Sequence, residues 1–146
     1  MDFSPYLRER NLKVTPQRMS ILKILDQHTH PTVEELLEKI RRDFPSVSTS
    51  TIYKNLNILK EMNMIIEIST QIGRSRLDIY IRPHAHIICK NCGAIEDIDF
   101  TDSTHMCKKE FEDNSSYEIT KLNITATVDS CRHCREIDLE ALNIFK

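Results

Sequence analysis

The sequence predicts an α+β protein built from an N-terminal winged helix-turn-helix domain, residues 1–82, and a small C-terminal α/β domain, residues 83–146. Three observations predict this. Helical patterns fill the first half and end in a pair of β-rich runs. All five cysteines lie after position 88. The charge also changes sign, because residues 1–83 hold 13 Lys and Arg against 10 Asp and Glu, whereas residues 84–146 hold 7 against 12.

Length and composition exclude several classes of protein. A chain of 146 residues is too short for a barrel enzyme, and 2 glycines cannot supply a glycine-rich phosphate loop. No apolar run approaches the ~18 residues of a membrane span, and the first residues lack an apolar export signal. We therefore expect a cytoplasmic protein with no membrane partner, whose cysteines are metal ligands or free thiols rather than disulfides.

The N-terminal half predicts helices with recognisable ends. Thr15-Pro16 opens a helix, since proline suits a first turn, and Thr32 with Glu35 forms a capping box for the next helix, which ends at Phe44-Pro45. A further helix begins in the Ser-Thr run at 48–51, and Asn63 is a left-handed stop. A short leading helix is expected over 6–11.

Two β-rich runs follow, Met64–Ser69 and Arg76–Ile81, around a turn over 70–75. Helices followed by a hairpin indicate a winged helix, whose recognition helix enters the DNA major groove. The predicted DNA-binding residues are Lys13, Arg18, Ser50, Thr51, Tyr53, Lys54 and Asn55, with Arg74 and Arg76 as backbone or minor-groove contacts. The alternative is a small helical bundle that binds protein.

Two C-x-x-C motifs predict a metal site in the C-terminal half. Cys89 and Cys92 form one motif, and Cys131 and Cys134 form the other. Two residues between thiolates let both sulfurs bind one tetrahedral ion, and four thiolates make a closed structural Zn²⁺ site without a catalytic position. The alternative, a redox-active pair, is usually a single motif. Cys107 is expected to be a half-buried structural thiol.

The remaining C-terminal pattern predicts a strand over 94–100, a helix over 102–113, a strand over 117–128 and a short final helix over 138–145. Such a module is small to be stable alone, so zinc and dimerisation are expected to stabilise it.

His84 and His86 precede the first cysteine motif, and in an extended segment residues i and i+2 point to the same side. Carboxylates at Asp78 and Asp97, and the imidazole of His30, are further candidate ligands. These residues come from both halves of the chain, so a metal bound by all of them would fix the angle between the domains.

The sequence resembles the ferric uptake regulator family over nearly its whole length. The resemblance rests on five segments: Asn11–Arg18, His30–Thr32, Ser50–Leu56, His84–Gly93 and Cys131–Cys134. It implies a homodimeric, metal-dependent transcriptional repressor of operator DNA and not an enzyme. The resemblance also implies that the protein has no small-molecule substrate beyond a metal ion and peroxide.

Within that family the chain looks most like the peroxide-sensing (PerR) branch. The resemblance implies a regulatory Fe²⁺ or Mn²⁺ site formed by His30, Asp78, His84, His86 and Asp97. Iron-sensing members typically carry Glu at the two Asp positions. It also implies that His30 and His84 are oxidised to 2-oxo-histidine when peroxide meets bound iron. Lys54 departs from the usual residue and leaves the operator preference open. A further metal site of some members is expected to be absent.

Two alternatives remain. The first is an iron- or zinc-uptake regulator of the same family that senses metal occupancy only. The second is a metal hydrolase or oxygenase with an open site at Asp78, His84 and His86. It is disfavoured because five ligands leave little room for a substrate. His28 and His133 are expected to be surface residues, and His105 has no assigned role.

Overall fold

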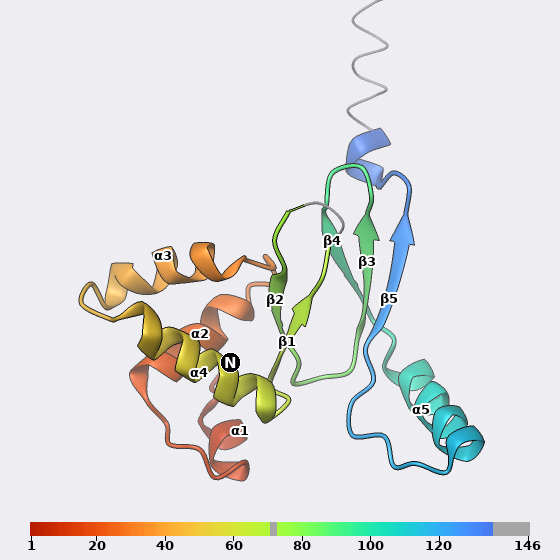
Figure 1. Cartoon of the computed structure of the whole chain (residues 1–146), viewed down its shortest axis with the longest axis horizontal. Helices are drawn as coiled ribbons and strands as arrows, with labels where there is room; N and C mark the ends of the chain where they lie inside the picture. Colours follow the sequence, from red (N-terminus) through yellow and green to blue (C-terminus); the bar gives the residue numbers. More distant parts are fainter. Residues whose placement is uncertain (71–72, 136–146) are drawn as a thin grey trace, which may run out of the picture. The chain divides into compact units, whose positions relative to one another are not determined.

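The computed structural model describes residues 1–70 and 73–135. These residues form two compact units, with residues 1–69 and 74–81 in unit 1 and the remaining described residues in unit 2. Figure 1 labels their helices and strands.

Unit 1 contains the helices that the sequence predicts, namely α1 (Ser4–Glu9), α2 (Pro16–Leu25), α3 (Val33–Asp43) and α4 (Thr49–Glu61). Each of the last three begins at a hydroxyl side chain that caps its first turn. Thr15 accepts from the backbone N–H of Arg18. Thr32 accepts from the N–H of Glu35, whose carboxylate accepts from the N–H of Thr32, so the predicted capping box is confirmed.

Single residues determine where α4 ends and where α1 begins. Asn63 has a φ of +53° just after α4, which confirms the left-handed stop. The leading helix is displaced from its expected range of 6–11. It begins at Ser4 because Pro5 fits its first turn, and Asn11 lies beyond it with a φ of +56°.

A hairpin completes unit 1. Strands β1 (Ile65–Ile68) and β2 (Arg76–Ile79) pair antiparallel, with Ile65 opposite Ile79. Apolar side chains of the helices and the hairpin form one core: Phe3, Leu7, Ile21, Leu22, Leu25, Leu36, Leu37, Ile40, Ile52, Leu56, Leu59, Met64, Ile65, Leu77 and Ile79. Helices with a wing-like hairpin are the predicted winged-helix architecture.

Unit 2 is a three-stranded sheet with one helix, built from β3 (Ala85–Cys89), β4 (Ile95–Ile98), α5 (Thr101–Ser115) and β5 (Ile124–Val128). The strand order is β4-β3-β5, with β4 antiparallel and β5 parallel to the central strand β3 (Figure 1). β3 is mostly buried, as expected for a central strand.

The strand predicted over 117–128 is too long. Within this range, residues 124–128 form the ladder with the five residues of β3. The N–H of Ile119 instead donates to the Glu112 carboxylate at the end of α5, 3.0 Å away, which holds the preceding segment out of the sheet. The final helix predicted over 138–145 lies outside the described residues.

Across the two described stretches of the chain, none of the helices combines the length and the apolar character needed to cross a membrane.

Candidate metal centres and nucleic-acid surface

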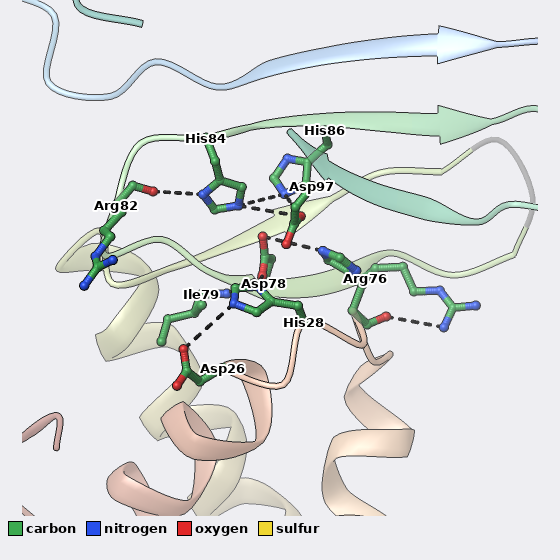
Figure 2. A network of polar contacts seen from close by, with 10 residues as sticks. Asp26, His28, Arg76, Asp78, Ile79, Arg82, His84, His86 and Asp97 are labelled. Atoms are coloured by element: carbon green, nitrogen blue, oxygen red, sulfur yellow. Dashed lines mark hydrogen bonds and ion pairs between the residues drawn. The ribbon is translucent and has the colours of Figure 1, made fainter. Parts of the chain in front are cut away.

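Three of the candidate regulatory ligands converge in unit 2, and we call them the His-His-Asp triad: His84, His86 and Asp97. His86 lies on β3 directly opposite Asp97 on β4, and its Nε2 is 3.2 Å from Oδ1 of Asp97. The Nε2 of His84 is 3.0 Å from the Nε2 of His86 and 3.8 Å from the same carboxylate oxygen. Figure 2 shows the two rings and the carboxylate pointing toward one another.

The tautomer of His84 is fixed by its other nitrogen. Its Nδ1 lies 2.8 Å from the backbone carbonyl of Arg82 (Figure 2). A carbonyl only accepts, so Nδ1 carries a proton, and in the neutral ring the lone pair lies on Nε2. Histidine ligands of metals are commonly oriented in this way. His84 is therefore oriented to bind a metal ion through Nε2, the atom that faces His86 and Asp97.

Unit 1 brings together the other two candidate ligands, which we call the His-Asp pair. The Nε2 of His30 is 3.7 Å from Oδ2 of Asp78, and both side chains are buried. The other oxygen of Asp78 accepts from the N–H of Ile79 at 2.8 Å. An imidazole nitrogen and a carboxylate oxygen held this close supply two donor atoms that suit a metal cation.

His28 also approaches the His-Asp pair. Its ring is half exposed, as expected, yet its Nδ1 lies 4.0 Å from Oδ1 of Asp78 and its Nε2 lies 3.9 Å from Asp26 (Figure 2). The sequence predicted His28 only as a surface residue. The His-x-His spacing of His28 and His30, which repeats that of His84 and His86, was the available sign.

Imidazole nitrogens and carboxylate oxygens suit Fe²⁺ and Mn²⁺, because both ions favour such donors over soft thiolates. The chemistry of the pair and of the triad therefore fits a regulatory metal. The chain thus holds a candidate regulatory His/Asp metal site and, separately, a candidate zinc site.

The four cysteines of the two C-x-x-C motifs gather in unit 2, with all Sγ atoms within 4.8 Å of one another. Sγ–Sγ distances are 3.8 Å from Cys89 to Cys134, 3.7 Å from Cys92 to Cys131 and 3.6 Å from Cys131 to Cys134. A tetrahedron with Zn–S bonds of about 2.3 Å has edges of about 3.8 Å. The sulfurs thus fit a tetrahedral Zn²⁺ ion.

Backbone groups already favour a thiolate in this cluster. N–H groups of Cys92, Cys131 and Asn91 point at the sulfur of Cys89 and lower its pKa to about 6. The pKa of Cys92 shifts in the opposite direction. The N–H of Ala94 favours its thiolate, but the neighbouring thiols of Cys134, Cys89 and Cys131 together with burial raise its pKa to about 12. Sulfurs packed this closely cannot all ionise without a cation between them.

The exposed face of α4 carries the predicted DNA-binding residues Ser50, Thr51, Tyr53 and Lys54, and Tyr53 is 43% exposed. Arg18 and Asn55 are engaged within unit 1, because the Nε of Arg18 donates to Oδ1 of Asn55 at 3.1 Å. Arg18 also donates to the carbonyl of Lys13 at 2.9 Å. They brace α4 against α2.

The two arginines of the hairpin are both paired with α3. Arg74 forms an ion pair with Glu34, and the Nη1 of Arg76 lies 3.3 Å from Oε2 of Glu35. The sequence predicted both side chains as DNA contacts, and it did not predict these partners because they are far away along the chain.

Comparisons with known proteins agree on one family. Residues 9–127 match the model of the ferric uptake regulator family. The peroxide-responsive repressor PerR of Staphylococcus aureus is 39% identical over 95 residues, which are 64% of this chain and 64% of that protein. The match thus spans less than two thirds of that relative's length.

Solved structures give the same result. The crystal structure of a Campylobacter jejuni peroxide stress regulator is similar with a TM-score of 0.76 and 38% identity, covering 92% of this chain and 100% of that chain. The Helicobacter pylori ferric uptake regulator Fur, described with three functional metal binding sites, has a TM-score of 0.64 and 25% identity, covering 90% and 87%. The chain belongs to the ferric uptake regulator family of metal-responsive transcription regulators, and it is similar to peroxide-responsive members of that family.

Proposed function

We propose that this protein is a homodimeric, cytoplasmic transcriptional repressor that binds double-stranded operator DNA when loaded with Fe²⁺ or Mn²⁺ and is inactivated by hydrogen peroxide. Residues 1–82 bind DNA, and residues 83–146 dimerise and hold structural Zn²⁺ at Cys89, Cys92, Cys131 and Cys134. The regulatory ligands are His30, Asp78, His84, His86 and Asp97.

The His-His-Asp triad supports this proposal most strongly. Its three donor atoms lie within 3.8 Å of one another, with the tautomer of His84 already set for binding through Nε2. The His-Asp pair supplies two further donors from the other unit. Filling both sets with one ion would fix the two units relative to each other, which is how occupancy would control DNA binding.

In the proposed peroxide response, a histidine ligand of the regulatory metal is irreversibly oxidised. When bound, Fe²⁺ would supply the redox chemistry that activates peroxide, which Mn²⁺ would not. In the net change the imidazole of His30 or His84 gives up two electrons, the C–H bond between its ring nitrogens is replaced by a bond to one peroxide oxygen, and the second oxygen leaves as water. A 2-oxo-histidine is a poor metal ligand, so the site would open and the operator would be released.

The protein-side roles follow from the contacts. The backbone carbonyl of Arg82 holds the His84 ring. The carboxylate of Asp97 faces both imidazoles of the triad. The buried Asp78 carboxylate supplies negative charge on the side of His30. The competing function, an iron- or zinc-uptake regulator, uses the same donors without consuming a histidine.

Anaerobic protein loaded with Fe²⁺ or with Mn²⁺ separates these functions. A duplex is first selected from a random-sequence pool with the Mn²⁺-loaded protein. Low peroxide is then added to both samples, with DNA binding and peptide masses followed together. We expect one added oxygen on His30 or His84 and loss of binding with iron only. Unmodified histidines and retained binding would instead establish a metal-occupancy regulator. Zinc loss with intact histidines would make the cysteine cluster the sensor.

A further inference from the structure

The backbone at His30 is strained, although its ring is a candidate metal ligand. His30 has a φ of +48°, in the left-handed region that is unfavourable for a residue with a Cβ. It also precedes Pro31, and proline restricts the residue before it to extended conformations. Such a conformation persists only where neighbouring groups hold it. The contacts around this segment therefore decide where the His30 ring points.

Strand β2 supplies those contacts from consecutive residues. The N–H of Leu77 donates to the carbonyl of Pro31 at 2.8 Å. The Nη1 of Arg76 donates to the carbonyl of His30 at 3.5 Å. Residues i and i+2 of a strand share a face, so Arg76 and Asp78 lie on the same face. Arg76 contacts the backbone of His30, and Asp78 faces its ring.

Glu35 fixes the guanidinium of Arg76. Its Oε2 lies 3.3 Å from Nη1 of Arg76 and accepts from the N–H of Thr32 at 3.1 Å. One carboxylate therefore joins the arginine to the capping box that begins α3. The strained residue is enclosed between this charged contact and the Leu77 hydrogen bond.

We propose that Arg76, held by Glu35, is a positioning residue for His30 and not a DNA contact. The inference rests on the proposed function, because it assigns His30 to the regulatory site. The side chain of Arg76 is 32% exposed, and its Nη1 faces three protein oxygens. Arg74 differs, because its side chain is 71% exposed and its partner Glu34 lies outside the capping-box contacts. Arg74 is the better candidate for a phosphate contact and the matched control.

The test compares full-length Arg76→Met and Arg74→Met, both loaded with zinc. Free Mn²⁺ is followed by electron paramagnetic resonance during titration. Loss of a residue that orients a metal ligand typically weakens binding by about 10- to 100-fold, and we expect a loss near the lower end for Arg76→Met. Arg74→Met should bind Mn²⁺ like the wild type. Glu35→Gln keeps a capping-box side chain and should weaken binding less than Arg76→Met.

DNA binding at saturating Mn²⁺ tests the alternative role, in which Arg76 contacts DNA. If Arg76 only positions His30, the salt dependence of duplex affinity stays that of the wild type. A slope reduced by about 0.9 per lost phosphate contact, with Mn²⁺ affinity unchanged, would overturn the proposal and make Arg76 a DNA contact.

A third readout needs no regulatory metal. The imidazole ¹⁵N and ¹H shifts of His30 in protein holding zinc alone should change in Arg76→Met and stay in place in Arg74→Met. Unchanged shifts in Arg76→Met would overturn the positioning role. If Arg76→Met does not fold, Arg76→Lys, which keeps the charge but loses the planar fork, takes its place. Wild-type protein that binds no Mn²⁺ through His30 would disprove the proposed function, while the shifts would still test the inference.

Discussion

The Nε2 of His86 lies 3.2 Å from Oδ1 of Asp97, directly across the antiparallel pair of β3 and β4. Strand pairing, rather than a loop, therefore sets the distance between an imidazole and a carboxylate that are both candidate ligands. A position fixed this firmly is sensitive to the length of the acid, because one added methylene moves the carboxylate relative to the ring.

Asp97→Glu should keep Mn²⁺ binding and DNA binding but lose peroxide sensitivity. The longer side chain would bring its carboxylate closer to the metal position and would leave less room there for peroxide. Histidine oxidation in the Fe²⁺-loaded variant should therefore be slower than in the wild type. Mass spectrometry over a peroxide time course measures this. Wild-type oxidation rates in Asp97→Glu would contradict the assigned role of the aspartate.

Oxidation should fall on His30 and not on its half-exposed neighbour His28. Trypsin releases both histidines in one peptide, residues 24–39, because no Lys or Arg lies between Lys23 and Lys39. Fragment ions that separate the two positions must therefore place the oxygen. The Mn²⁺-loaded protein is the control. An oxygen found mainly on His28 would exclude His30 as the reactive ligand in unit 1.

Cys134→Ser should abolish stoichiometric zinc binding and unfold much of unit 2, because metal binding and folding are coupled in small modules of this kind. Elemental analysis and circular dichroism report the two effects. Cys107→Ser is the matched control, since Cys107 on α5 lies outside the four-sulfur cluster. Full zinc content in Cys134→Ser would show that the cluster does not depend on its fourth sulfur.

Thr32→Ala should destabilise the protein by about 1 kcal/mol through loss of the α3 cap. Thr32→Ser retains an accepting hydroxyl and should differ little from the wild type. Urea unfolding at fixed zinc content measures both free energies. Equal stability of Thr32→Ala and wild type would mean that Glu35 alone suffices to hold the start of the helix.

Lys54→Ala and Asn55→Ala should lower DNA affinity for different reasons. Lys54 is exposed on α4, so its removal should leave stability unchanged and reduce the salt slope by about 0.9 if it contacts a phosphate. Asn55 receives the Arg18 guanidinium, so its loss should cost about 1.5–3 kcal/mol of stability. Thermal unfolding beside DNA titration separates the two. Equal stability of both variants would contradict the bracing role of Asn55.

Much of unit 1 was predictable because its determinants are local. The capping box of Thr32 and Glu35 and the left-handed Asn63 each involve residues within one turn, and both were confirmed. The cysteine cluster was predictable for another reason, since two motifs of the right spacing limit the chemistry of the site to few possibilities.

The central strand β3 was harder to predict. The sequence predicts that His84 and His86 point to the same side only on the condition that this segment is extended. A strand buried on both faces lacks the alternation that marks a half-exposed strand, so its pattern is weak. The pairing of Arg76 with Glu35 was missed because it joins residues 41 positions apart, and only the folded chain brings them together.

β3 carries candidate ligands of two metals, with His86 near its start and Cys89 at its end. At about 3.3 Å per residue the two positions are separated by only about 10 Å of backbone. A cell starved of zinc would therefore make a protein whose candidate regulatory ligand His86 loses a neighbouring structural support. The proposed peroxide response would then depend on zinc nutrition, even where iron is plentiful.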